Sequence, residues 1–142
     1  MKFSSVAFFS VLFATTYGAQ VTYDNTYDAP RGSLSTVACS NGANGLLTKG
    51  FTTFGSLPKF PFIGGAQAVV SWNSPNCGSC WNLTYQGTTI SVLAIDHAGS
   101  GFNIAQRAMD TLTHGQAVDL GVVQVASQRS VTQYRLSGQK IP

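Results

Sequence analysis

Apolar and polar positions alternate in short runs along most of the chain, and Gly, Pro, Asn or Ser separates these runs about every 8 to 12 residues. The clearest case is a hairpin, in which residues 81–85 and 88–95 flank the two-residue turn Gln86-Gly87. This pattern favours a mainly β fold, a small barrel or sandwich, over βαβ units. Four more segments have the composition of strands: residues 21–24, 34–38, 67–72 and 122–126.

One helix interrupts the β pattern. Apolar residues recur at helical spacing between Ile104 and Leu112, Asn103 is a suitable N-cap residue, and Gly115 is suited to end the helix. We interpret the apolar stripe as core contact. Trp72 and Trp81 would stack well on sugars, but their place in strand patterns favours burial in the core for both.

The N-terminus has the pattern of a secretory signal peptide. Lys2 is followed by an apolar run from Val6 to Phe13 and then by small residues up to Ala19. We therefore expect a leader over residues 1–19, one domain over 20–128 and an atypical tail over 129–142, and an extracellular or cell-wall location. No apolar run approaches the about 18 residues that span a bilayer, so no membrane partner is expected.

Charge argues against several function classes. The chain has no Glu and only five Asp, so few carboxylate pairs are available for catalysis. Three of its eight basic residues, Arg129, Arg135 and Lys140, lie in the tail. Because a nucleic-acid footprint needs clustered Lys and Arg on the folded body, no nucleic-acid partner is expected.

Cys39, Cys77 and Cys80 are the three cysteines of the chain. Their spacing, with His97 and His114, does not give the ligand pairs of a zinc site, and a strand pattern rather than a helix follows Cys80. We therefore expect no metal, no redox dithiol and no cofactor. In an oxidising compartment, a disulfide between Cys39 and either Cys77 or Cys80 is the better interpretation.

Several segments together resemble the cerato-platanin family of small secreted fungal proteins. They are VTYDNTYD, SLSTVACSNGANGL, FPFIGGAQAV, WNSPNCGSCWNLTY and SVLAIDHAGSGFNIAQRAMDTLTHGQAV, and they cover about residues 20 to 126. The resemblance implies a six-stranded double-ψ β barrel with one or two short helices, related to the first domain of expansins. It also implies a Cys39–Cys77 disulfide. The family's fourth cysteine, near the C-terminus, is absent here, so Cys80 is expected to be unpaired, as a free thiol or in an intermolecular bond.

The resemblance further implies a function, since family members bind chitin fragments or loosen cellulose without cutting it. Asp96 ends an apolar run and precedes a glycine-rich turn, which would hold it at the barrel mouth. We expect it to bind sugar hydroxyls in a polar groove. The residues expected to complete this carbohydrate-binding groove are Asn103, Tyr23, Asp24 and Asp28. The expected partners are chitin fragments and cellulose, with plant receptors as further partners if the protein elicits plant defence.

Two alternatives stay open at this point. One is a weak glycoside hydrolase on the same barrel, with Asp96 and Asp24 as acid and base. The other is a self-assembling, surface-active structural protein, which the charged fraction of 9% and the apolar segment FPFIGG favour.

Overall fold

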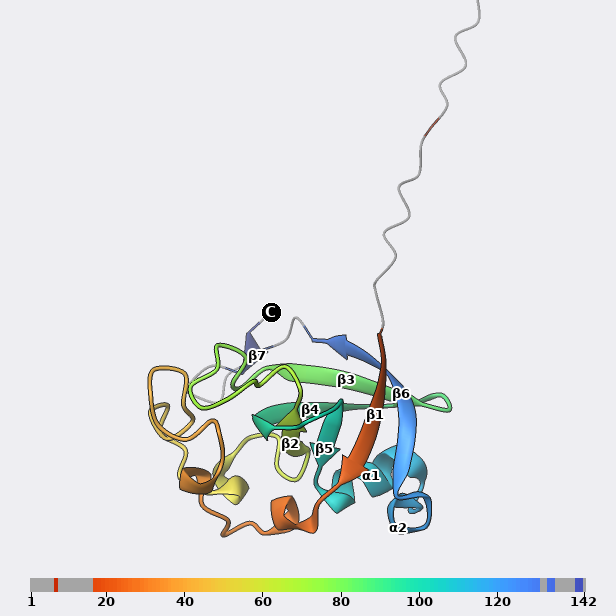
Figure 1. Cartoon of the computed structure of the whole chain (residues 1–142), viewed down its shortest axis with the longest axis horizontal. Coiled ribbons are helices and arrows are strands. Elements are labelled where there is room, and N and C mark those ends of the chain that lie inside the picture. Colours follow the sequence, from red (N-terminus) through yellow and green to blue (C-terminus); the bar gives the residue numbers. More distant parts are fainter. Residues whose placement is uncertain (1–6, 8–16, 131–132, 135–139, 142) are drawn as a thin grey trace, which may run out of the picture.

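The computed structural model describes residue 7 and residues 17–130, 133–134 and 140–141. Six strands form a closed barrel in the order β1-β5-β2-β4-β3-β6 (Figure 1). The pairs β1–β5 and β2–β4 are parallel and the others are antiparallel, so the barrel is mixed. The predicted mainly β, six-stranded barrel is confirmed. Its strands are β1 (Tyr17–Tyr23), β2 (Ile63–Ala66), β3 (Cys80–Tyr85), β4 (Thr88–His97), β5 (Phe102–Ile104) and β6 (Val122–Arg129).

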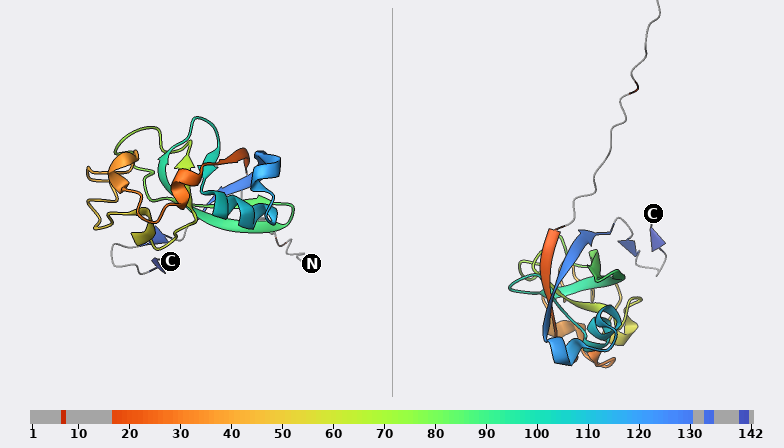
Figure 2. Two further views of the ribbon diagram at one scale, coloured as in Figure 1. Left: turned by 90° about the horizontal axis from the view of Figure 1, so that it is seen from below. Right: turned by 90° about the vertical axis from the view of Figure 1, so that its right-hand side faces the viewer.

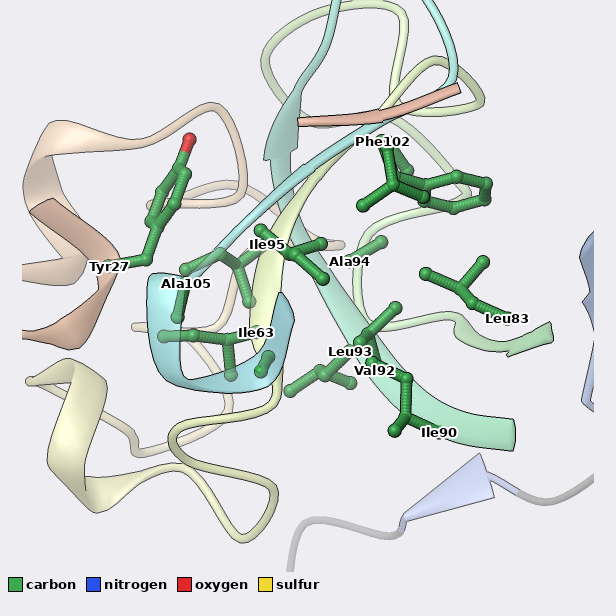
Figure 3. Packing of buried hydrophobic residues seen from close by; sticks show 14 of the residues in the cluster. Tyr27, Ile63, Leu83, Ile90, Val92, Leu93, Ala94, Ile95, Phe102 and Ala105 are labelled. Carbon is green, nitrogen blue, oxygen red and sulfur yellow. The ribbon is translucent and has the colours of Figure 1, made fainter. Parts of the chain in front are cut away.

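The β3–β4 hairpin forms as predicted. Tyr85 pairs with Thr88, and the turn residues Gln86 and Gly87 have φ values of 45° and 82°, which is the left-handed backbone of a two-residue hairpin turn. Leu83 and Val92 from this hairpin are buried in the core. Figure 3 shows the core packing, with Leu83 and Phe102 at one side of the view and Tyr27 at the other.

Two short helices, α1 (Gln106–Thr113) and α2 (Ala117–Leu120), follow β5. The predicted apolar stripe of α1 is buried, and the helix ends where predicted, at His114 and Gly115 with φ values of 54° and 85°. The predicted N-cap is wrong, because Asn103 lies within β5 and the chain pairs as a strand up to Ile104. Helix α1 therefore begins later, and its first N–H groups find a partner outside the helix.

Two predicted strands are also wrong. Residues 34–38 contain a 3₁₀ helix, η2 (Leu34–Thr36), and residues 67–72 form turns after β2 instead of a strand. The strand β2 lies earlier in the chain. It contains Gly64 and Gly65, which have no side chains, so the sequence shows no apolar–polar alternation there. A Cβ at Gly64 would stand 2.4 Å from the backbone oxygen of Asn103, so the neighbouring strand requires glycine here.

The predicted burial of Trp72 in the core is wrong, because this residue is 57% exposed. The turn structure of residues 67–72 is the reason, since no sheet fixes the indole against the barrel interior. Trp81 is partly buried and packs edge-on against Phe102, with ring centroids 5.5 Å apart.

We call the long segment between β1 and β2, residues 24–62, the covering segment, and it packs against one side of the barrel. It holds two more 3₁₀ helices, η1 (Asn25–Asp28) and η3 (Phe54–Ser56). Figures 1 and 2 show it in orange to yellow, at the end of the molecule away from α2. Cys39 N–H donates to the oxygen of Ile95, at 3.1 Å, so the segment is fixed directly on β4. The buried apolar residues of this segment are Tyr27, Leu34, Val37, Leu46, Phe54 and Leu57.

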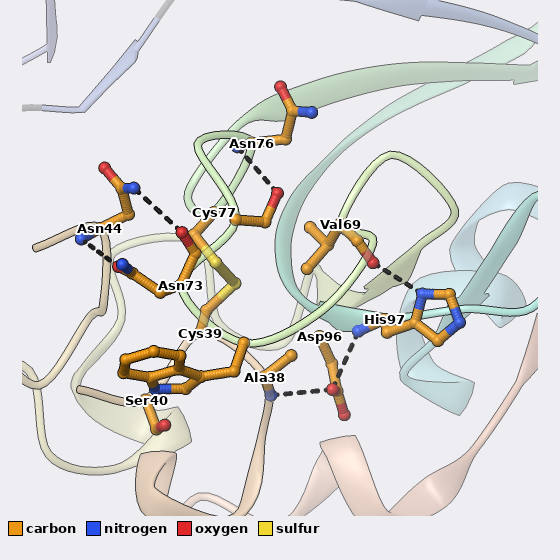
Figure 4. Close-up of a disulfide and its surroundings, with 12 residues drawn as sticks. Ala38, Cys39, Ser40, Asn44, Val69, Asn73, Asn76, Cys77, Asp96 and His97 are labelled. Atoms are coloured by element: carbon orange, nitrogen blue, oxygen red, sulfur yellow. Dashed lines mark hydrogen bonds between the residues drawn. A yellow bond between two sulfur atoms is a disulfide. The ribbon is translucent and has the colours of Figure 1, made fainter. Parts of the chain in front are cut away.

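A disulfide joins Cys39 to Cys77, with the Cα atoms 5.5 Å apart, which agrees with the pairing that the family resemblance implied (Figure 4). It ties the covering segment to the loop before β3. Cys80 is a free thiol and only 2% exposed. Burial raises the pKa of the Cys80 thiol, although the charges of Lys59 and Arg129 lower it in part. This position favours a free thiol over an intermolecular bond.

Residues 129–142, predicted to be an atypical tail, include β7 (Gln133–Tyr134) and β8 (Lys140–Ile141), which pair antiparallel with each other. β6 itself extends to Arg129, at the start of the predicted tail. Among the residues that the structure describes, no helix has the length and apolarity required to cross a membrane. No cluster of His, Cys, Asp or Glu suited to hold a metal ion occurs in the same part of the chain.

We predict that the disulfide contributes strongly to stability. The double variant Cys39→Ala/Cys77→Ala should lower the free energy of unfolding by about 2–5 kcal/mol, because the open chain gains entropy when the loop is no longer closed. Urea unfolding followed by circular dichroism measures this. The control Cys80→Ala should cost less, since no cross-link is lost. An equal loss in both variants would contradict the prediction.

Candidate functional site

Four residues on four neighbouring strands stand side by side across the barrel. Thr22 of β1 pairs with Asn103 of β5, Asn103 pairs with Gly65 of β2, and Gly65 pairs with Asp96 of β4. Paired residues of a sheet present their side chains on the same face. We call this set, Thr22, Asn103, Gly65 and Asp96, the polar row.

The polar row lies on the outer face of the barrel. Val21 precedes Thr22, and Phe102 and Ile104 flank Asn103, and all three are buried in the core. Because successive side chains of a strand point to opposite faces, Thr22 and Asn103 point outward, and both are half-buried. The structure thus brings together Asp96 and Asn103, two of the predicted site residues.

Within the row, the Thr22 hydroxyl donates to Asn103 Oδ1 at 2.9 Å. This bond orients the amide, so that its NH₂ group faces away from Thr22. Gly65 has no side chain, and a Cβ there would stand 2.7 Å from the oxygen of His97. The row is therefore a hydroxyl and an amide on one side and a carboxylate on the other, separated by a buried glycine.

Asp96 is held by three hydrogen bonds. Its Oδ1 accepts from the backbone N–H groups of Ala38, at 3.0 Å, and His97, at 2.9 Å, as Figure 4 shows. Its Oδ2 accepts from the Tyr27 hydroxyl at 2.9 Å. A carboxylate offers about four acceptor positions, so three are used and about one remains for a ligand.

Tyr27 reaches Asp96 from η1 in the covering segment. Burial raises the pKa of the Tyr27 hydroxyl well above its usual range, and the charge of Asp96, the hydrogen bond to it and the charge of Asp24 raise it further. The phenol therefore stays protonated and keeps donating to Asp96. Asp24 is close enough to act on this hydroxyl, and it also accepts from Thr26 N–H at 2.9 Å as the N-cap of η1.

The structure places the other two predicted residues elsewhere. Asp28 accepts from the N–H groups of Gln106, at 2.8 Å, and Arg107, at 3.0 Å, so it caps α1 in place of the predicted Asn103. It also forms an ion pair with Arg107 at 3.4 Å. Tyr23 points to the opposite face from Thr22 and packs against the core. Neither belongs to the polar row.

Sequence reasoning did not single out Thr22 or Gly65, and it chose Tyr23 rather than Tyr27. Alternation around Val21 would have placed Thr22 outward. No local signal marks Gly65, because its role depends on strands far away in the chain. Tyr27 meets Asp96 only through the fold of the covering segment, since 69 residues separate them.

The histidines do not form a catalytic arrangement in the described structure. His97 Nδ1 lies 2.6 Å from the oxygen of Val69, and His114 Nε2 lies 3.1 Å from the Thr88 hydroxyl. Each contact joins one end of β4, at His97 or Thr88, to a residue outside the strand. Chemically, the polar row presents acceptors and donors for hydroxyl groups, and its carboxylate already carries three donors.

The chain and its fold match those of known proteins. The model of the family described as cerato-platanin matches residues 19–136. The chain belongs to the cerato-platanin family. The match extends past residue 126, where the resemblance in the sequence was expected to end.

Named relatives support this membership. The chain is 52% identical over 107 residues to the heat-stable 19 kDa antigen of Coccidioides posadasii, covering 75% of this chain and 73% of that protein. It is 52% identical over 118 residues to allergen Asp f 15 of Aspergillus fumigatus, covering 83% and 77%. Cerato-platanin of Ceratocystis fimbriata f. sp. platani is 36% identical over 113 residues, covering 79% and 80%.

Solved structures of the family agree with the barrel. Cerato-platanin 2 from M. perniciosa superposes with a TM-score of 0.76 at 52% identity, over 81% of this chain and 95% of that chain. The solution structure of the fungal elicitor cerato-platanin gives a TM-score of 0.67 at 35% identity, over 75% and 90%.

The Tyr27–Asp96 bond predicts a pH dependence. The folded-state pKa of Tyr27 lies above its unfolded value of about 10, so its contribution to stability is complete below pH 10 and is lost as the pH rises beyond it. Urea unfolding of the parent at pH 8 to 12 should show this loss. The variant Tyr27→Phe should be less stable at pH 8 but should lose less stability above pH 10. Identical slopes for both proteins would contradict the prediction.

Proposed function

We propose that this protein binds neutral cell-wall polysaccharides, such as chitin fragments and cellulose, along the polar row, and that it loosens contacts between glycan chains without hydrolysis. The observation that carries the proposal is the row itself: Thr22, Asn103 and Asp96 are aligned outward on neighbouring strands around Gly65. Hydroxyl, amide and carboxylate groups are the types that hydrogen-bond to sugar hydroxyls.

The dimensions of the row suit an extended glycan. Neighbouring strands lie about 4.8 Å apart, so the row from Thr22 to Asp96 spans roughly 14 Å, the length of a few sugar units. Gly65, between Asn103 and Asp96, is buried, and the backbone oxygen of His97 packs against it. A sugar chain that follows the row would therefore contact the hydroxyl and the amide at one end and the carboxylate at the other.

The strength of each contact explains how loosening differs from tight binding. A hydrogen bond contributes only about 0.5–1.5 kcal/mol net in water, so a few contacts give weak, reversible association. Such contacts compete with hydrogen bonds between glycan chains. The protein can exchange one set for the other and move on.

The geometry of Asp96 supports binding over cleavage. Hydrolysis commonly uses two carboxyl groups, one of which transfers a proton to the leaving oxygen. Asp96 accepts from two backbone N–H groups and from Tyr27, so it acts as a hydrogen-bond acceptor in all three of these contacts. Asp24, the other candidate, accepts from Thr26 N–H in its capping role.

Location and host recognition complete the proposal. The signal-like N-terminus and the disulfide are typical of an extracellular protein. One structural relative is titled a fungal elicitor, and other relatives are named as an antigen and an allergen. We extend these properties to this chain as a protein that meets host receptors outside the fungal cell.

Asn103→Ala tests the polar row with less disturbance of the fold than a change at Asp96. It should weaken binding to insoluble chitin and cellulose in a pull-down assay and reduce filter-paper fragmentation, because the row loses its amide. The matched control is Gln116→Ala, which removes an exposed amide at the N-cap position of α2 whose side chain forms no capping hydrogen bond. Thermal unfolding checks that both variants fold.

Equal binding by parent and Asn103→Ala would overturn the role of the row. Reducing ends are measured in the same samples. Their release by the parent, together with its loss in Asp96→Asn, would favour the glycoside hydrolase in place of a binding protein.

Self-assembly at interfaces is the second candidate, and an apolar cluster favours it. Val118, Leu120 and Val122 are 59%, 38% and 49% exposed. The first two lie in α2, and Val122 is the first residue of β6. If this cluster drives association, the variant Val118→Ser/Val122→Ser should reduce concentration-dependent light scattering severalfold without changing glycan binding. Unchanged scattering would count against this candidate.

A further inference from the structure

We propose that Trp72 is a stacking platform for a sugar ring and forms a second glycan subsite beside the polar row. This inference rests on the proposed function, because it assigns part of the same glycan to a surface outside the row. Exposure is the first reason. The indole is 57% exposed, although its burial would contribute stability, so the fold leaves a large apolar face in water.

The indole is exposed but held in place. Its Nε1–H donates to Asn41 Oδ1 at 2.7 Å. Its six-membered ring lies against Gly42, where a Cβ would stand 3.1 Å from Trp72 Cζ2. Gly42 has a φ of 87°, so both its backbone and the neighbouring ring disfavour a side chain. A ring fixed at its polar edge loses little freedom when a ligand stacks on it.

The loop that carries Trp72 is fixed at several points (Figure 4). Asn73 Oδ1 accepts from Asn44 N–H at 2.9 Å, and the oxygen of Asn73 accepts from Asn44 Nδ2 at 3.0 Å. Asn76 Nδ2 donates to the oxygen of Ala68 at 2.9 Å, and the disulfide follows at Cys77. The platform is therefore built before any ligand arrives.

The surroundings of Trp72 select a neutral, polar ligand. Residues 39–47 and 67–77 contain no Asp, Glu, Lys or Arg, but they are rich in Asn and Ser. A charged side chain contacts this loop at Asn76, whose Oδ1 accepts a hydrogen bond from Arg129 Nη1 at 2.9 Å. An aromatic face among amides and hydroxyls suits the apolar face and the equatorial hydroxyls of a β-linked pyranose chain.

The platform is connected to the polar row through one residue, Ala38. Ala38 N–H donates to Asp96 Oδ1 at 3.0 Å, and the oxygen of Ala38 accepts from Asn73 N–H at 3.4 Å. Asn73 directly follows Trp72. One end of the row and the indole are thus neighbours, and a glycan long enough to pass beyond Asp96 reaches Trp72. Long oligosaccharides should bind more tightly than short ones, because the second contact is intramolecular.

Tryptophan fluorescence tests this, since Trp72 and Trp81 are the two tryptophans of the chain. The secreted full chain is titrated with chitohexaose and with cellohexaose. In the variant Trp81→Phe, where only Trp72 emits, the hexasaccharide should change the emission and protect it from acrylamide quenching. If that variant does not fold, the difference between parent and Trp72→Phe gives the same signal. Trp72→Ala should weaken the Kd about tenfold or more.

The control is Val70→Ser, which removes an apolar side chain that is 73% exposed on the same loop and should leave the Kd unchanged. If parent binding responds to Asn103→Ala but not to Trp72→Ala, or if Trp72 emission does not respond to the sugar, the platform is refuted and the polar row stands. If the parent binds neither hexasaccharide nor the insoluble polymers, the proposed function and the platform both fail.

Discussion

The close approach of backbones around Gly64 and Gly65 is the constraint on which the structure depends. A Cβ at either position would collide with backbone oxygens of the neighbouring strands, at 2.4 Å from Asn103 and 2.7 Å from His97. Without side chains there, β2 fits between β5 and β4 and completes the barrel. Gly65 is also the position between Asn103 and Asp96 in the polar row. Closure of the fold and the arrangement of the candidate site therefore both depend on glycine at this position.

The covering segment serves stability and the site in the same way. Its buried apolar residues belong to the hydrophobic core of the molecule, while Tyr27 and Ala38 from the same segment hold the Asp96 carboxylate. The disulfide joins this segment to the loop of Trp72. Stability and site geometry are consequently coupled, so a substitution at Asp96 disturbs packing as well as any ligand contact.

The sequence predicted what depends on local patterns. The hairpin around Gln86-Gly87, the buried stripe of α1 and its end at Gly115 follow from alternation, helical spacing and turn chemistry. It failed where distant segments decide the outcome. Asn103 reads as a helix cap, but pairing with Thr22 and Gly65 makes it a strand residue, and Asp28 from another segment takes the cap. The pairing of Asp96 with Asn103 likewise requires the barrel register, which periodicity alone does not give.

Cys80 lies three residues after a disulfide partner, and this arrangement invites exchange of the bond. Exchange requires a thiolate that reaches a sulfur of the existing bridge. In the folded protein burial raises the pKa of the Cys80 thiol, so formation of the thiolate is suppressed. Folding of the barrel thus slows exchange of the Cys39–Cys77 disulfide. Exchange is expected mainly in the unfolded chain, where the Cys80 thiol is not buried.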